Sequence, residues 1–201
     1  MQEPWSLWWD RGHGDRTEVT LLPKPAGRER CQTMAGHDMA ESSDESARWH
    51  RYARGWSAVC FHDGWVVVRP VERAEAEPDR RLDGLAIITA ANPYGEPLTE
   101  EENEQRRELL RVRLLRTGMP LLATVGGFAD TSDPEAWTGR ERGFAVPLSR
   151  EEAALIAGEF DQEAIYVFEN GSRILISATD APAIEGFYRI GHPGLVIESA
   201  H

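Results

Sequence analysis

Cysteine is scarce in this chain, which has two cysteines in 201 residues. Cys31 and Cys60 stand far apart and have no Cys or His neighbours at the spacing of metal ligands, so the sequence indicates neither a disulfide framework nor a zinc site. The six histidines show no paired spacing for a metal either. We therefore expect no metal and no cofactor, and a reducing compartment.

Long apolar runs and a surplus of basic residues are also missing. No stretch approaches the roughly 20 apolar residues of a membrane-spanning helix, and the N-terminus lacks a basic region followed by an apolar run. The formal net charge of −12 repels phosphate backbones, because non-specific nucleic-acid binding depends on Lys and Arg. We expect a cytoplasmic protein that binds neither membranes nor nucleic acids.

The first 48 residues have few apolar side chains. Gly, Pro, Ser and charged residues dominate positions 10 to 48, and such a segment buries too little apolar surface to offset the entropy of ordering it. We predict a poorly ordered arm over residues 1–48 and a single α/β domain over 49–201. Trp5, Trp8 and Trp9 on the arm would either dock on that domain or meet a partner.

Short strands and two helices alternate from residue 46 onward. Two hairpins are predicted around Asp63-Gly64 and Asn170-Gly171. Capping boxes formed by Thr99 with Glu102 and by Ser149 with Glu152 predict the starts of two helices. The expected strands span residues 56–61, 65–69, 85–90, 121–125, 143–148, 164–168 and 172–176, and a short helix is expected over 46–54.

The order of elements from residue 85 is βαββαββ. A split βαβ sandwich of the ferredoxin-like type, an α/β (α+β) fold preceded by the N-terminal hairpin and the flexible arm, is the simplest topology with short connections and right-handed crossovers. In that topology the strands 85–90 and 143–148 are adjacent and parallel. Their carboxyl ends and both helix starts would then share one edge of the sheet.

Part of the chain resembles an uncharacterised bacterial family, a domain of unknown function. In that family a strand ends in Thr-Ala-x-Asn-Pro, and the next helix begins with Leu-Ser/Thr-x-x-Glu-Asn. The matching stretches are Thr89-Ala-Ala-Asn92-Pro93-Tyr94-Gly95, Leu98-Thr-Glu-Glu-Glu102-Asn103 with Arg106, Glu141-Arg-Gly-Phe144 and Phe160-Asp-Gln162-Glu-Ala164-Ile165. The resemblance covers about residues 84–176 and implies no activity. Two positions depart from it, because Ala91 replaces a common aromatic residue and Gly143 a common serine.

Polar side chains gather at the predicted sheet edge, where open α/β sheets tend to bind ligands. The expected ligand-binding residues are Asn92, Tyr94, Glu102, Asn103, Arg106, Glu141 and Gln162. Of these, Glu102 could serve as a general base, and Tyr94 and Arg106 as substrate anchors. Structural roles compete with these assignments, since Glu102 also completes a capping box, and Arg106 is spaced to pair with it along the helix.

Three functions remain open from the sequence. The first is a binding or regulatory module for a small polar molecule or a partner protein. The second is a small cofactor-free enzyme of a specialised biosynthetic pathway, which a raised pKa of Glu102 would favour and an exposed Glu102 would disfavour. The third is an obligate subunit of an oligomer, whose edge strand or tryptophans another chain covers.

Overall fold

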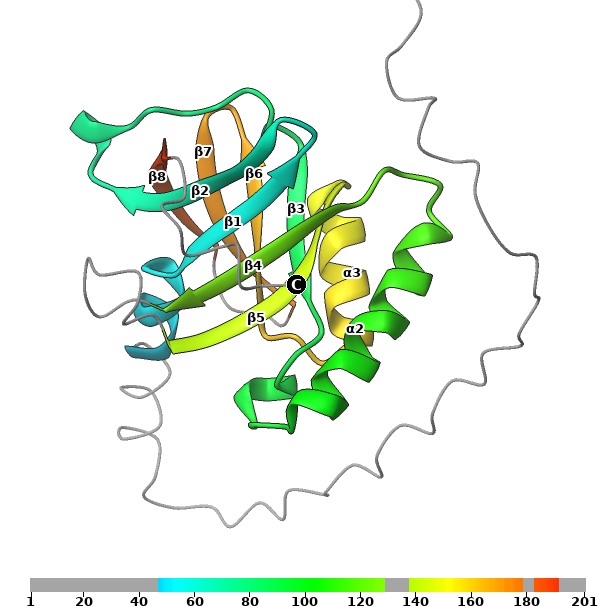
Figure 1. Cartoon of the computed structure of the whole chain (residues 1–201). Helices are drawn as coiled ribbons and strands as arrows, with labels where there is room; N and C mark the ends of the chain where they lie inside the picture. Colours follow the sequence, from blue (N-terminus) through cyan, green and yellow to red (C-terminus); the bar gives the residue numbers. More distant parts are fainter. Residues whose placement is uncertain (1–46, 129–137, 179–182, 192–201) are drawn as a thin grey trace, which may run out of the picture. The chain divides into compact units, whose positions relative to one another are not determined.

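The computed structural model describes residues 47–128, 138–178 and 183–191 (Figure 1). The predicted arm and its tryptophans lie outside the described residues, apart from positions 47 and 48. The elements are a helical segment over 47–53, β1 (Trp56–Phe61), β2 (Gly64–Val71), η1 (Arg73–Glu75), β3 (Leu85–Thr89), η2 (Pro93–Gly95), α2 (Glu100–Leu115), β4 (Leu122–Phe128), β5 (Thr138–Pro147), α3 (Arg150–Glu159), β6 (Ala164–Glu169), β7 (Ser172–Ser177) and β8 (Ile184–Gly191).

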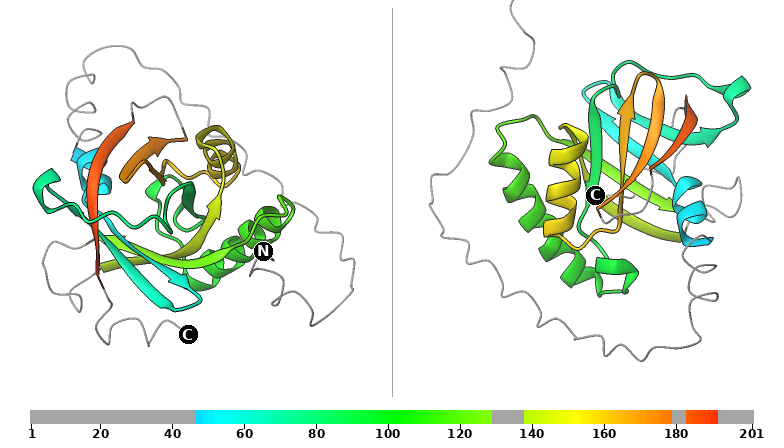
Figure 2. Two further views of the ribbon diagram at one scale, coloured as in Figure 1. Left: turned by 90° about the horizontal axis from the view of Figure 1, so that it is seen from above. Right: turned by 180° about the vertical axis from the view of Figure 1, so that it is seen from behind.

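The strands form a closed barrel in the order β1-β2-β8-β7-β6-β3-β5-β4, and β4 returns to β1 (Figure 2). Every pair of neighbouring strands is antiparallel. The predicted ferredoxin-like α/β sandwich is therefore wrong. The N-terminal hairpin, which was expected to precede the sandwich, and β8, which was not predicted, join β4 to β7 and so remove both sheet edges.

The strands β3 and β5 are adjacent, as expected, but they run in opposite directions. Leu85 lies opposite Pro147 and Thr89 lies opposite Gly143. The carboxyl end of β3 therefore meets the middle of β5, and the start of α3 lies at the other end of the barrel. The predicted gathering of both helix starts at one sheet edge does not occur.

The local predictions agree with the structure. Thr99 and Ser149 both form complete capping boxes, with Glu102 and Glu152 respectively. Both predicted hairpins are present as β1 with β2 and β6 with β7. Each of these features depends on residues close together in the sequence.

Two apolar layers fix the barrel and its helices. Outside the barrel, α2 and α3 lie side by side over β3, β5, β6 and β7 (Figures 1 and 2), and Leu110, Leu114 and Ile156 are fully or almost fully buried there. Inside, side chains from β1, β2, β3, β5, β6 and β8, and one from the segment before β3, fill one part of the lumen. They are Val59, Val68, Leu82, Leu85, Ile87, Ala145, Phe168 and Tyr188.

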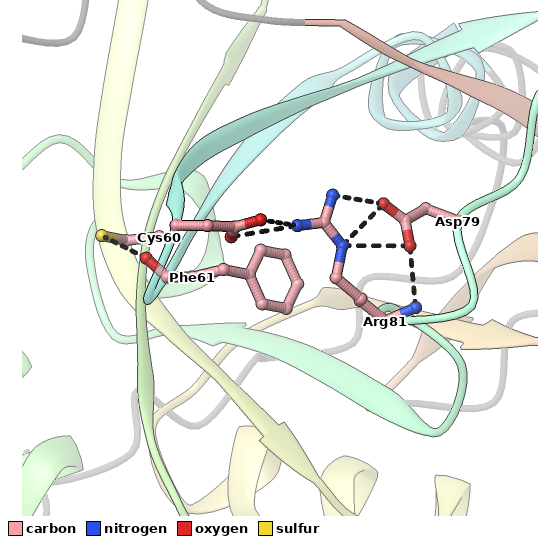
Figure 3. Close-up of polar contacts among 5 residues, drawn as sticks. Cys60, Phe61, Asp79 and Arg81 are labelled. Carbon is pink, nitrogen blue, oxygen red and sulfur yellow. Dashed lines mark hydrogen bonds and ion pairs between the residues drawn. The ribbon is translucent and has the colours of Figure 1, made fainter. Parts of the chain in front are cut away.

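Polar contacts close the tip of the β1–β2 hairpin against the segment that leads into β3. The guanidinium of Arg81 donates hydrogen bonds to both Asp79 and Asp63, and its Cζ lies 4.8 Å from the centroid of the Phe61 ring. Figure 3 shows Arg81 between the Asp79 carboxylate and the Phe61 ring. Cys60 lies in the same region, and its Sγ contacts the Phe61 carbonyl oxygen.

Among the described residues, no helix is long and apolar enough to cross a membrane. In the same residues no group of three or more His, Cys, Asp or Glu side chains is close enough together to hold a metal ion.

Candidate functional site

A cavity of about 460 Å³ lies at the end of the barrel that the interior apolar cluster leaves unfilled. Ile87, Ala91 and Leu175 contribute apolar surface to its wall. An eight-stranded barrel is just wide enough to be filled by side chains or to hold one small ligand. The polar residues of the lining are Arg48, Arg51, Tyr52, Ser57, Thr89, Asn92, Tyr94, Glu96, Glu141, Gln162, Glu163 and Tyr166.

Asn92 ties the end of β3 to β5 and to α2. Its Oδ1 accepts hydrogen bonds from the Leu98 backbone N–H and from Nδ2 of Asn103, both at 3.1 Å. Because a backbone N–H can only donate, this contact orients the amide and leaves Asn92 Nδ2 to donate to Glu141 Oε1 at 3.0 Å. The φ angle of 48° at Asn92 lies in the left-handed region, which asparagine tolerates better than most residues.

Gln162 fixes the hydroxyl of Thr89. Its Nε2 donates to the Ala91 carbonyl oxygen at 2.7 Å, so its Oε1 is the atom that faces Thr89. Thr89 Oγ1 lies 2.7 Å from this Oε1. Since an amide oxygen only accepts, the single hydroxyl proton of Thr89 points to Gln162.

Glu141 is consequently short of donors. Its Oε2 lies 3.3 Å from Thr89 Oγ1, but the Thr89 proton is already committed to Gln162. The contact is favourable only when Glu141 itself carries a proton and donates it to Thr89. Burial raises the pKa of Glu141, and the hydrogen bond from Asn92 opposes this rise only in part. Glu141 is thus a protonatable carboxyl group on the wall of the cavity.

Ser57 presents a second polar group to the same space. Its side chain is 0% exposed, it lines the cavity, and its Oγ has no hydrogen-bond partner among the described residues. Ser57 lies opposite Gly126 in the β1–β4 register, and Gly126 lies opposite Glu141 in the β4–β5 register. Residues paired across antiparallel strands share a face of the sheet. Ser57 and Glu141 therefore flank a glycine that offers no side chain to either.

The helical segment 47–53 borders the cavity. Arg48 forms an ion pair of 3.2 Å with Glu163, and the Tyr52 hydroxyl donates to Glu163 Oε2 at 3.1 Å. Burial raises the pKa of Tyr52 to about 12, and the nearby charge of Glu163 adds to the rise. This segment is therefore held to the loop before β6 by polar contacts at the cavity's edge.

Two side chains from the barrel hold the end of the same segment. Arg173 is buried and donates to the Gly55 and Ala53 carbonyl oxygens. The Tyr166 hydroxyl donates to the Tyr52 carbonyl oxygen at 2.5 Å. Carbonyl groups at a helix C-terminus have no partner within the helix, and a cation is favourable there. Arg173 and Tyr166 thus dock the segment onto the barrel.

The structure brings four of the seven predicted site residues to the cavity: Asn92, Tyr94, Glu141 and Gln162. Tyr94 is 56% exposed, and its hydroxyl donates to Asp161. Its pKa is raised, first by this hydrogen bond. It therefore lies at the mouth of the cavity.

The other three predicted residues do not line the cavity. Glu102 is exposed on the first turn of α2, where its hydrogen bonds with Thr99 lower its pKa. Asn103 holds the backbone N–H of Asn92 at 2.9 Å, and Arg106 donates to the Ala90 and Phe160 carbonyl oxygens. An exposed carboxylate with a lowered pKa is a poor general base, so the features expected of a catalytic Glu102 are missing.

Sequence reasoning missed Ser57, Thr89 as an oriented hydroxyl, and the docking residues Tyr166 and Arg173. One signal for Arg173 was available. It is a charged residue inside Ser172–Ser177, a strand whose first five residues are all buried. Ser57 carried no such signal, because a small hydroxyl residue is unremarkable in a strand.

Residues 88–165 match the model of a protein family described as a protein of unknown function (DUF3293). The resemblance to a domain-of-unknown-function family is thus confirmed over this segment, which includes β4, β5 and both helices. It also includes Thr89, Asn92, Glu141 and Gln162, whereas Ser57 and the segment 47–53 lie outside it. No curated protein matches the chain, and no solved structure does.

Proposed function

We propose that the protein is a binding module for a small polar ligand, which it holds in the cavity at the end of the barrel. One observation carries this proposal. A fully buried hydroxyl, that of Ser57, lines the cavity without a partner among the described residues. A buried polar group without a hydrogen bond costs about 1–3 kcal/mol, so a ligand that supplies the bond gains this free energy.

The cavity has the composition of a small-molecule site. Ligand pockets of about 300–1,000 Å³ combine apolar walls with a few converging polar groups. Here Ile87 and Leu175 supply the apolar wall, and Ser57, Thr89 and Glu141 the polar groups. The hydrogen bonds of Asn92 and Gln162 hold these groups in place before any ligand arrives, which reduces the entropy cost of binding.

A cavity-blocking variant tests the proposal. A Cβ atom at Gly126 would lie 3.5 Å from the Trp56 carbonyl oxygen and would contact little else, so Gly126→Val should fold and fill the space beside Ser57. Thermal-shift measurements against a metabolite library should find a compound that stabilises the wild-type protein and not this variant. A ligand at 100 times its Kd adds about 2.7 kcal/mol to the free energy of unfolding.

Gly158→Ala is the control for the substitution itself, because a Cβ at Gly158 on α3 would meet no atom within 4 Å. This variant should respond to the ligand as the wild type does. A library in which no compound distinguishes wild type from Gly126→Val would contradict the proposed function.

An enzyme is the second candidate, and Glu141 favours it. Burial raises the pKa of this carboxyl group, which brings an acid or base closer to neutral pH, where proton transfer is most efficient. Turnover of the ligand found in the screen, and its loss in Glu141→Gln with binding retained, would favour the enzyme over the binding module.

The hypothesis of an obligate subunit of an oligomer loses one of the two observations that suggested it. An exposed edge strand was one of the two features that suggested it, but the described strands close into a barrel. The other feature, the tryptophans of the arm, lies outside the described residues. A partner protein and a cytoplasmic location remain expectations from the sequence.

A further inference from the structure

Ser57, Gly126 and Glu141 lie side by side across three strands, and they place a hydroxyl group and a carboxyl group on either side of a glycine. Three neighbouring strands contribute one residue each, from β1, β4 and β5. Two strand spacings separate the outer residues, which places their Cα atoms about 10 Å apart. Glycine in the middle leaves an open recess between a hydroxyl group and a carboxyl group, wide enough for a planar group of a ligand.

The buried and half-buried basic side chains near this recess already have hydrogen-bond or ion-pair partners. Arg48 is paired with Glu163, and Arg173 donates to backbone carbonyl oxygens. Arg51 and Glu96 also line the cavity, but both are exposed. An anion in the recess would lie beside the Glu141 carboxyl, and the buried Arg173 does not line the cavity and donates to backbone carbonyl oxygens instead. The site therefore disfavours an anionic group.

A proton on Glu141 would disfavour a cation as well. The orientation of Gln162 sends the Thr89 proton away from Glu141, so the carboxyl group donates to Thr89 Oγ1 when it is neutral. A cation would have to displace this proton and break the Thr89 contact. In the neutral state, the carboxyl oxygens still have lone pairs that can accept from a ligand.

Building on the proposed function, we infer that the cavity takes an uncharged group with a hydrogen-bond donor and an acceptor side by side, such as an amide or ureide edge. The group lies over Gly126. Its acceptor receives the Ser57 hydroxyl proton, and its donor binds a Glu141 oxygen. An uncharged group with a donor and an acceptor can bond to the Ser57 hydroxyl and to the Glu141 carboxyl group at the same time. A charged group of the ligand would lie in the recess without a counter-charge.

Three probes of the same shape test this inference: benzamide, which is neutral, benzoate, an anion, and benzamidine, a cation. Their Kd values for the full chain at pH 7 can be measured by ligand-observed NMR. We expect benzamide to bind at least about tenfold more tightly than either charged probe, a difference of about 1.4 kcal/mol. Tightest binding by benzoate or benzamidine, or no binding by any probe, overturns the inference.

Variants identify the two contacts. Glu141→Gln keeps the hydrogen bonds of a neutral Glu141, because its amide can donate to Thr89 and accept from Asn92. Benzamide binding should therefore change by less than about threefold in this variant. Ser57→Ala should weaken it about tenfold, the loss expected for one hydrogen bond. If Glu141→Gln instead abolishes binding, the carboxyl group acts as an anion and the inference is wrong.

Thr124→Val is the control for Ser57→Ala. Thr124 is 2% exposed, and its Oγ1 likewise has no partner among the described residues, but it does not line the cavity. Its replacement should leave benzamide binding unchanged.

The proposed function and the inferred ligand chemistry can fail independently of each other. A library compound that binds the wild type and not Gly126→Val supports the ligand-binding function. If a charged probe nevertheless binds more tightly than benzamide, only the inferred chemistry of the ligand is wrong.

Discussion

The guanidinium of Arg173 lies over the ring of Tyr166, with its Cζ 4.5 Å from the ring centroid. The two side chains start on neighbouring strands, β7 and β6, and both donate to the end of the helical segment 47–53. This cation and aromatic pair joins the barrel to the segment that borders the cavity. Arg173 is 4% exposed, and this burial lowers its pKa.

Arg173→Met should loosen this attachment. The substitution keeps most of the side-chain volume but leaves the Gly55 and Ala53 carbonyl oxygens without their charged donor. We expect the free energy of unfolding to fall by about 1.5–3 kcal/mol, the range for hydrogen bonds to charged groups. Urea denaturation measures the loss, and hydrogen exchange should report faster opening of residues 47–53.

Arg111→Met is the control for this prediction. Arg111 contacts Glu108 on the exposed face of α2, and such surface pairs contribute about 0–1 kcal/mol. Equal losses in the two variants would contradict a docking role for Arg173.

The stability of the protein should depend on Glu141 at mildly acidic to neutral pH. The pKa of this group is raised from 4.5 in the folded protein, so the folded state binds its proton more tightly than the unfolded state does. The stabilising contribution is therefore complete below pH 4.5 and is lost as the pH rises through the folded pKa. Tyr52 and Tyr166, which lie within electrostatic reach of Glu141, have raised pKa values and stay neutral in this range.

Glu141→Gln removes this proton and isolates its effect. The free energy of unfolding of the variant minus that of the wild type should rise with pH, by no more than about 1.4 kcal/mol per pH unit. It should level off above the folded pKa. Urea denaturation of both proteins from pH 4.5 to 8 gives the curve. A difference independent of pH would mean that the pKa of Glu141 is the same in the folded and unfolded states, which contradicts the rise.

Gly143 should not tolerate a side chain, in contrast to Gly158. A Cβ at Gly143 would lie 2.4 Å from the Ile88 carbonyl oxygen, because β3 and β5 approach closely there. We expect Gly143→Ala to cost about 1–3 kcal/mol by overpacking. Gly158→Ala in α3 should instead add about 0.5–1 kcal/mol, since alanine favours a helix. Thermal or urea unfolding checks both, and a neutral Gly143→Ala would show that the strands can separate.

Tyr52 should ionise well above the usual pKa of a phenol. Its value of about 12 has burial as its first cause and the neighbouring Glu163 as the next. The neutral phenol is favoured in the folded state, so its stabilising contribution persists below pH 10 and is lost as the pH approaches 12. The phenolate absorbance of wild type minus Tyr52→Phe gives the titration. Glu163→Gln should lower the pKa, and an unchanged value would contradict the Tyr52–Glu163 contact.

Much of the candidate site could be predicted from its sequence motif. Asn92, Glu141 and Gln162 were assigned to one ligand site, and they do meet at the cavity. Their meeting depends on the antiparallel pairing of β3 with β5, which places Thr89 opposite Gly143. In the expected parallel pairing Glu141, which precedes the strand predicted over 143–148, would lie at the other end of the sheet. Glu102 was drawn into the site by its place in the same motif, although its capping-box spacing already gave it a structural role.

The sequence by itself determined the local elements of this protein: the two capping boxes, the hairpin turns and most of the strands. These features arise from contacts between residues a few positions apart. Tertiary structure alone decided that the strands close into a barrel, since the pairings of β1 with β4 and of β2 with β8 join segments separated by more than 60 residues. Only closure places Ser57 beside Gly126 and Glu141, because a recess inside a barrel exists only when the distant strands that form its wall have met.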